Sequence, residues 1–183
     1  EPLLIAKRSG VPVAVAAKRV EAARLLAESG EVDVLIADDG LQHYQLARDI
    51  EILVVDGQRR FGNGLVLPAG PLREPLERVA TCDYVVVNGG QAQGDEVQMR
   101  LKLTQAKSLL SEVSLALSDL VRTPVHAVAG IGNPARFFDA LRAEGLEVIE
   151  HAFPDHHVFS PEDLKFDDGF PIVMTEKDAV KCM

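Results

Sequence analysis

The sequence predicts an α/β protein built on parallel β-sheet, and two observations support this class. Apolar runs of strand length at 34–37 and 51–57 lack polar alternation, which is typical of strands covered on both faces. A helix-compatible pattern at 19–28 precedes the first run and stops near Gly30. Strand, helix and strand with short connections form the βαβ unit of a parallel sheet.

The expected elements fall into two series along the chain. The first consists of a strand, a helix and two further strands, at 12–17, 19–28, 32–37 and 51–57. The second contains strands at 82–89, 125–132, 146–153 and 171–174. Asn133 and Pro134 suit the N-cap and first position of a helix that continues to Ala143. Residues 97–122 have mixed spacing and are assigned neither to strands nor to a helix.

A stretch dense in glycine and proline, at 57–75, separates the two series. Such composition indicates a crossover between domains, which would lie at 1–66 and 67–183. A long surface loop is the alternative. Against it, linkers rarely concentrate arginines beside glycines that allow close backbone approach.

Composition excludes some classes of function. The chain has 183 residues and a formal net charge of −9, which argues against nucleic acid as a partner. Cys82 and Cys182 match no metal-ligand spacing and fit a reduced intracellular compartment. No signal peptide or membrane-spanning apolar run is present. The chain begins with Glu-Pro and stops directly after a patterned segment, so we expect a fragment of a longer protein.

The apolar run at 34–37 ends in two adjacent carboxylates, Asp38 and Asp39, followed by Gly40. Ligands of open α/β folds bind at the carboxyl ends of strands, where carboxylates can hold Mg²⁺ against a nucleotide phosphate. Asp and Gly are also ordinary turn residues, so a plain polar turn is the alternative. Gln42 and His43 add more polar groups than a turn needs, which favours a site.

Three further motifs follow predicted strands. In Phe153–His157, Asp155 can orient the His156 imidazole, which could then relay a proton; a solvated loop is the alternative. The glycine turn at 130–134 leads into a helix and suits packing better than an anion. Thr175 and Asp178 are explained first by helix capping.

Taken together, these motifs resemble the tetraacyldisaccharide 4′-kinase family of the lipid A pathway. The resemblance rests on seven stretches in family order, which together are highly specific: DDGLQH (38–43), RDIEI (48–52), FGNG (61–64), LPAGPLREP (67–75), AGIGNPARFF (129–138), FPDHH (153–157) and MTEKDAVKC (174–182).

The resemblance implies a P-loop nucleoside-triphosphatase core, here partial, joined to a second, smaller α/β domain. It implies transfer of the γ-phosphoryl of ATP to the 4′-hydroxyl of tetraacyldisaccharide 1-phosphate, giving lipid IVA. Asp38 and Asp39 would lie on the Mg²⁺ side, with Gln42, His43, Arg73 and Glu74 around the nucleotide. His156 would partner the family's catalytic aspartate, with Asp39 and Asp155 beside it.

The family's phosphate-binding loop has no counterpart in residues 1–183, and its catalytic aspartate would fall just before Glu1. We therefore expect these residues alone to be inactive. The whole protein would act at the cytoplasmic face of the bacterial inner membrane through parts outside this chain. Two alternatives stay open: a non-catalytic nucleotide or phospho-sugar binding module, and a metal-dependent phosphohydrolase that uses Asp38, Asp39 and Asp56.

Overall fold

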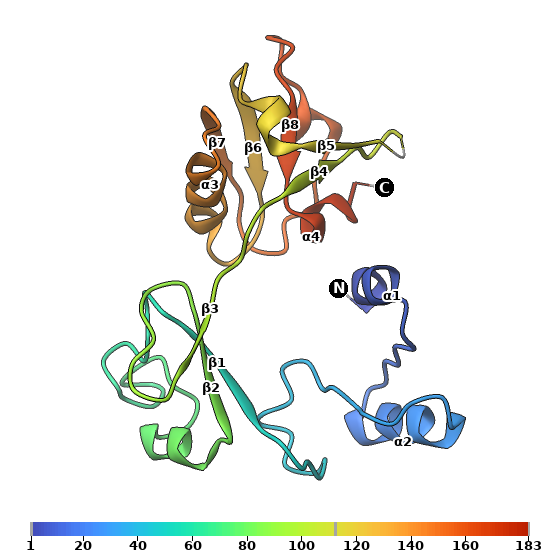
Figure 1. Cartoon of the computed structure of the whole chain (residues 1–183), viewed down its shortest axis with the longest axis vertical. Coiled ribbons are helices and arrows are strands. Elements are labelled where there is room, and N and C mark those ends of the chain that lie inside the picture. The colour runs from blue at the N-terminus through green and yellow to red at the C-terminus, as the bar shows by residue number, and fades with distance from the viewer. Residues whose placement is uncertain (1, 112, 183) are drawn as a thin grey trace. The chain divides into compact units, whose positions relative to one another are not determined.

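The computed structural model describes residues 2–111 and 113–182 and confirms the α/β class with parallel sheets. The chain divides into two compact units (Figure 1). Unit 1 comprises 3–10 and 102–183, and unit 2 comprises 11–101. The domain boundary predicted at 66/67 does not coincide with this division, because the strands on either side of 57–75 pair with each other.

Unit 2 contains one helix and a three-stranded sheet in which all strands are parallel. Helix α2 (Arg19–Ser29) ends at Gly30, whose φ of 68° closes its last turn. The sheet has the order β1 (Ile52–Asp56), β2 (Tyr84–Asn88) and β3 (Val97–Met99), and the 3₁₀ segment η1 (Leu76–Thr81) precedes β2. The strands expected at 51–57 and 82–89 are therefore confirmed.

The strands expected at 12–17 and 32–37 are not formed in the part of the chain that the structure describes. These segments form no regular secondary structure, and they pair with no neighbouring strand among the described residues. Ile36 is 93% exposed. An apolar run expresses a preference for burial, whereas a strand also requires a partner for its backbone N–H and C=O groups.

The long connection at 57–75 is a crossover within unit 2, as parallel strands require. Its first residue, Gly57, packs so closely on β2 that a Cβ would lie 2.0 Å from the Gly89 carbonyl oxygen. Further along, the Asn63 amide donates to the Ala69 carbonyl oxygen at 2.9 Å and closes the loop on itself. The Leu67–Pro68 peptide is cis. The segment is thus an ordered loop that leads into Arg73 and Glu74.

Unit 1 is built on a second parallel sheet, with the order β7 (Val148–Ala152), β6 (Val125–Ala129) and β8 (Ile172–Met174). All five residues of β6 are buried, as the central strand of a covered sheet should be. Helix α3 (Pro134–Ala143) packs Phe138 and Leu141 against this sheet. The strands expected at 125–132, 146–153 and 171–174 and the helix after Asn133 are confirmed.

The remaining elements of unit 1 are short: α1 (Pro2–Ser9), the antiparallel pair β4 (Gln105–Lys107) and β5 (Ser114–Ala116), the 3₁₀ turns η2 (Leu117–Leu120) and η3 (Pro161–Leu164), and α4 (Glu176–Ala179). The region at 97–122 that the sequence left open thus contains β3, the β4–β5 pair and η2. Within residues 2–111 and 113–182, no helix has the length and apolar character needed to cross a bilayer.

Candidate active site

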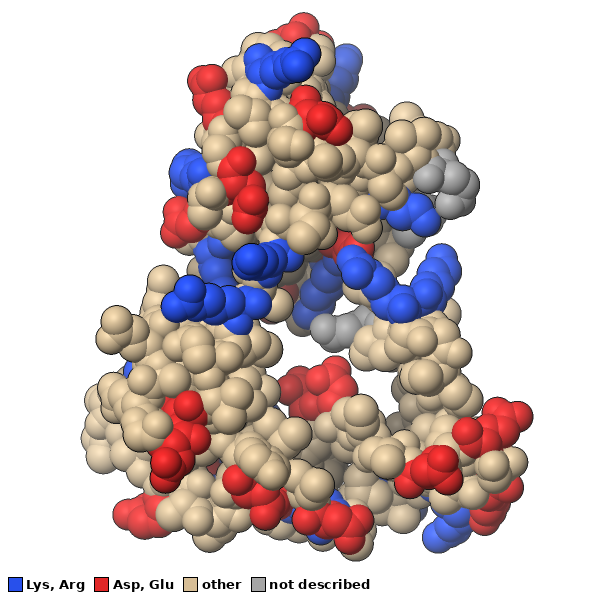
Figure 2. All heavy atoms as spheres, viewed as in Figure 1, with Lys and Arg blue, Asp and Glu red and all other residues tan. Residues whose placement is uncertain are grey.

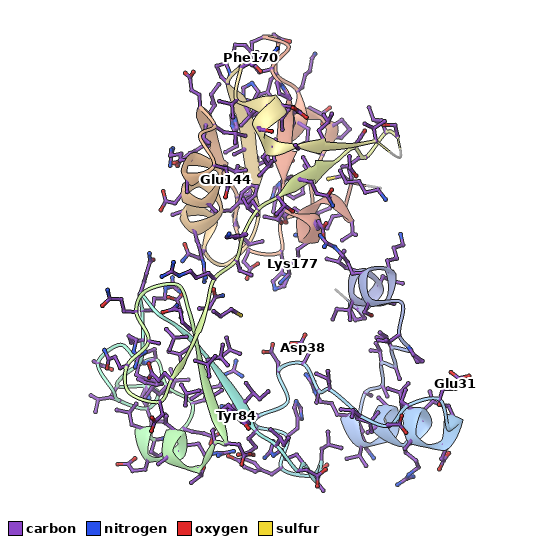
Figure 3. All side chains as sticks on the ribbon, in the orientation of Figure 1. Glu31, Asp38, Tyr84, Glu144, Phe170 and Lys177 are labelled. Carbon is purple, nitrogen blue, oxygen red and sulfur yellow. The ribbon has the colours of Figure 1, made fainter. Side chains whose placement is uncertain are left out.

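Asp38 and Asp39 of unit 2 lie on a tight turn before β1. Asp39 has a φ of 49°, and a Cβ on Gly40 would lie 2.8 Å from the Ala37 Cβ. The Arg19 guanidinium donates to the Asp38 carbonyl oxygen. Both carboxylates are exposed, and Figure 3 shows the Asp38 side chain pointing away from its loop. The backbone is therefore constrained while the two carboxylates stay accessible.

Asp38 and Asp39 fit part of a Mg²⁺ shell. Magnesium keeps several waters and uses one or two carboxylates together with substrate phosphates. Among the described residues, no group of three or more His, Cys, Asp or Glu could hold a metal by itself. Asp56, the third carboxylate of the phosphohydrolase alternative, instead accepts from the backbone N–H groups of Gln58 and Arg59 at 2.9 and 3.1 Å. A metal at Asp38 and Asp39 would need ligands from elsewhere.

A cavity of about 230 Å³ beside β1 brings together three of the predicted nucleotide-side residues. Arg73 donates to the Gln42 side-chain oxygen at 3.3 Å. Glu74 also lines the cavity, and its Oε1 atom is buried without a hydrogen-bond partner among the described residues. Its other oxygen accepts from the Tyr44 hydroxyl at 2.6 Å. A buried carboxylate oxygen without a partner is uncommon, so it marks Glu74 as a candidate for a ligand contact.

His43 lies apart from this cavity. It lines a smaller hollow of about 140 Å³ with Lys18 and Arg19, at the start of α2. The structure therefore groups Gln42, Arg73 and Glu74, and places His43 beside different residues.

In unit 1, the three predicted motifs meet at one edge of the sheet. Because β6, β7 and β8 are parallel, the segments at 130–134, 153–157 and 175–178 all follow carboxyl ends of strands. Basic side chains gather on the visible face at the end of unit 1 where Figure 3 labels Lys177 (Figures 2 and 3). Such an edge suits an anionic ligand.

Asp178 connects the segments of this edge through hydrogen bonds. Its side chain is fully buried; one oxygen accepts from the Gly130 N–H at 3.0 Å and the Thr175 hydroxyl at 2.8 Å. The other oxygen accepts from the Lys181 ammonium at 2.8 Å. Burial alone would raise the pKa of Asp178, but these hydrogen bonds outweigh it and the pKa lies below its ordinary value. Thr175 also caps α4, as the sequence predicts, through the Asp178 N–H at 3.2 Å.

The two adjacent histidines have different environments. His157 contacts the Asp163 carboxylate at 3.1 Å and stacks on Phe153 with ring centroids 4.6 Å apart, so it supports the loop. His156 has a φ of 62°, and its side chain is 77% exposed. Its Nε2 lies 3.7 Å from Asp155, a pairing longer than a hydrogen bond. Of the two side chains, that of His156 is the more exposed.

A polar cluster around the buried His126 in unit 1 has no counterpart in the sequence-based prediction. The His126 Nε2 lies 2.9 Å from both carboxylate oxygens of Asp168, and its Nδ1 lies 2.8 Å from the His151 Nε2. Since a carboxylate only accepts, His126 donates to Asp168 and accepts from His151. Phe166 stacks on the His126 ring at 3.8 Å. A histidine inside an otherwise apolar strand was the available signal.

Comparison with known proteins decides the family. A family model described as tetraacyldisaccharide-1-P 4′-kinase matches residues 1–183. The chain belongs to this family. Tetraacyldisaccharide 4′-kinases of Xanthomonas euvesicatoria and Stenotrophomonas maltophilia are 53% and 52% identical over the whole chain. It spans about half the length of these curated relatives, 56% in both cases.

One solved structure of this kinase family has the same fold. It is the "apo" form of LpxK from Aquifex aeolicus in complex with ATP, with a TM-score of 0.68 and 28% sequence identity. The match covers 91% of this chain and 54% of that chain. The predicted α/β class and the predicted family are therefore confirmed, whereas the roles of individual site residues stay predictions.

Proposed function

We propose that this chain is part of an ATP-dependent kinase that phosphorylates the 4′-hydroxyl of tetraacyldisaccharide 1-phosphate to give lipid IVA. The family match along all 183 residues carries this proposal. The ATP bound to the Aquifex aeolicus relative supports the choice of phosphoryl donor. A lipid acceptor would place the whole protein at the cytoplasmic face of the bacterial inner membrane.

Unit 2 would supply the donor side of the reaction. The exposed carboxylates of Asp38 and Asp39 would hold Mg²⁺, which neutralises phosphate charge during phosphoryl transfer. Arg73 and Gln42 line the cavity beside β1 and offer N–H donors to phosphate or ribose oxygens. The Glu74 Oε1 atom, which is buried and has no hydrogen-bond partner among the residues described, would accept a hydrogen bond from the ligand.

Unit 1 would supply the acceptor side. An imidazole that is mostly exposed, on a loop at the carboxyl edge of the sheet, can take the proton of the attacking hydroxyl. The Asp155 carboxylate, 3.7 Å from the His156 Nε2, would help to orient the ring. His156 would thus act as the general base of the transfer.

The first prediction concerns His156. In a protein of the relatives' full length, His156→Ala should lower turnover about 10²–10⁴-fold while the KM for ATP changes little, since general base catalysis is worth that much. Steady-state kinetics with ATP and tetraacyldisaccharide 1-phosphate measures both.

His157→Phe is the matched control, because it keeps the ring contact with Phe153 and should leave turnover near wild type. Equal loss in both variants would contradict the assignment to His156. Residues 1–183 alone should transfer no phosphoryl group, and metal-dependent phosphate release without the acceptor would favour a phosphohydrolase.

The second prediction concerns the acidic turn. Asp38→Asn or Asp39→Asn should raise the Mg²⁺ concentration for half-maximal rate by at least about tenfold, the scale observed even for groups one step removed from a metal. A Mg²⁺ titration of the initial rate measures this change. A wild-type Mg²⁺ response in both variants would return the motif to an ordinary turn.

A further inference from the structure

Five side chains of unit 2 form a closed ring of contacts between two segments that are distant in sequence. Three members belong to the segment after the acidic turn and two to the segment at the end of the crossover: Tyr44, Arg48, Glu51, Glu74 and Arg78. We call this set the arginine–glutamate ring. None of its contacts is evident from the sequence.

Ion pairs connect three sides of the ring. Arg48 Nε lies 2.6 Å from a Glu51 carboxylate oxygen, and the other Glu51 oxygen lies 2.7 Å from Arg78 Nη2. Arg78 Nε lies 3.3 Å from Glu74. The hydrogen bond to Glu51 is the main reason why the pKa of Arg78 lies above its ordinary value. These ion pairs are screened little, since their side chains are only 15–22% exposed.

Tyr44 closes the two remaining sides. Its hydroxyl donates to Glu74 at 2.6 Å, and its ring lies 5.2 Å from the Arg48 guanidinium carbon, within the range of a cation–π contact. Two arginines and two glutamates make the ring neutral overall, so no member is left as an uncompensated half-buried charge.

Arg48 connects the ring to the acidic turn. Its Nη1 donates to the Gly40 carbonyl oxygen at 2.9 Å and to the Leu41 carbonyl oxygen at 2.8 Å. The same Gly40 oxygen also accepts from the His43 N–H at 2.9 Å. One guanidinium therefore fixes the backbone directly after Asp38 and Asp39, while the far side of the ring holds Glu74.

We propose that Arg48 is a positioning residue: through the ring it sets the Asp38–Leu41 turn against the Arg73–Glu74 pair, so that metal and phosphate groups meet in one geometry. The inference rests on the proposed function. One part of the inference does not depend on any substrate: Arg48 and the ring connect the Asp38–Leu41 turn to the Glu74 carboxylate. Lysine cannot replace Arg48, because one ammonium cannot span two carbonyls and a carboxylate in the planar arrangement of a guanidinium.

The first test measures amide hydrogen exchange of the full-length protein. Arg48→Lys should speed exchange of the His43 and Leu46 amides about tenfold, the consequence of losing a hydrogen bond to a charged group. Glu51→Gln is the second variant, should Arg48→Lys fold poorly, and should have the same effect.

The matched control for exchange is Arg60→Lys. Arg60 forms a comparable pair with Glu96 at 2.6 Å, with side chains 26% and 15% exposed. Faster exchange should then appear near Gln93 and Glu96 and not at His43. Unchanged exchange at His43 and Leu46 in both Arg48→Lys and Glu51→Gln would overturn the proposal.

The second test uses phosphoryl transfer. Arg48→Lys should raise the Mg²⁺ concentration for half-maximal rate about tenfold, and the Arg48→Lys/Asp39→Asn double variant should be no worse than Asp39→Asn alone. Arg142→Lys, on the surface of unit 1, should match wild type. A wild-type Mg²⁺ response together with a lower Tm would reduce Arg48 to a structural residue and overturn the proposal.

The two tests separate the inference from the proposed function. Wild-type protein that transfers no phosphoryl group would contradict the proposed kinase activity, while the exchange measurement would still decide whether Arg48 positions the turn.

Discussion

The two units hold their polar groups in different ways. In unit 1, a single fully buried carboxylate, Asp178, fastens the ends of β6 and β8 from inside the core. In unit 2, the arginine–glutamate ring connects two loops through ion pairs whose side chains are 15–22% exposed. The first arrangement excludes water from one carboxylate, whereas the second distributes charge over several paired groups that keep limited contact with water. Strand ends thus define the edge in unit 1, whereas β1 and the neighbouring loops together line the cavity in unit 2.

The largest effect should come from the buried carboxylate. Asp178→Ala should lower the free energy of unfolding by about 3–5 kcal/mol, since it removes one partner of a buried charged group and leaves the Gly130 N–H unsatisfied. Urea unfolding measures this loss. Asp139→Ala, at a surface pair whose aspartate is 72% exposed, should change stability by less than about 1 kcal/mol. Similar losses in both variants would contradict the larger contribution expected of a buried carboxylate over an exposed one.

A smaller effect should distinguish two glycines, each at the carboxyl end of a strand. Gly57→Ala should cost about 1–3 kcal/mol, because the new methyl group meets the Gly89 backbone at 2.0 Å and the backbone cannot turn away. Gly130→Ala should cost less, since its nearest contact, a Phe159 ring atom at 3.2 Å, can shift. Thermal unfolding of both variants tests the order, and the reverse order would contradict the close approach seen at Gly57.

The smallest effect should appear as a pH dependence in unit 1. Burial, and then the neighbouring His126, lower the pKa of His151 below 6.5, while Asp168 opposes the shift. Below pH 6.5 the unfolded chain therefore binds a proton that the native state resists, so this contribution to stability is present above pH 6.5 and is lost as the pH falls. The pKa of Asp168 is also lowered, by its hydrogen bond from His126, but that group titrates below 3.8.

Urea midpoints between pH 7.5 and 5.5 measure the His151 contribution. His151→Gln can still donate to the His126 Nδ1 but does not titrate, so it should flatten the profile. The same slope in wild type and variant would assign the dependence to other groups.

The apolar sequence pattern predicted strands correctly where a neighbouring strand pairs with them, and incorrectly where none does. The patterns at 125–132 and 171–174 became strands because β6 lies between two neighbours. The equally apolar run at 34–37 stayed unpaired. Asp38 and Asp39 were predicted as site residues because several polar types cluster after an apolar run; that run forms no strand, and the roles of both residues stay predictions. Contacts between distant segments, such as that from Gln42 to Arg73, leave no mark on the sequence.

The sequence also could not distinguish the roles of adjacent residues of the same type. Both histidines of 153–157 fit a proton relay, and only the backbone at His156 and the Asp163 contact of His157 separate their environments. Asp178 was assigned to a helix cap, which is correct but incomplete, because nothing in the sequence shows that its other contacts lie at Gly130 and Lys181.

The position of β6 in the centre of its sheet has a consequence for synthesis on the ribosome. β6 emerges before both of its neighbours, and β8, which ends at Met174, is the last to be made. Until then, one edge of a strand that is wholly buried in the finished protein is open to any other strand. A nascent chain that stalls before Ile172 therefore presents an apolar, unpaired edge, the kind of surface that aggregates or recruits a chaperone.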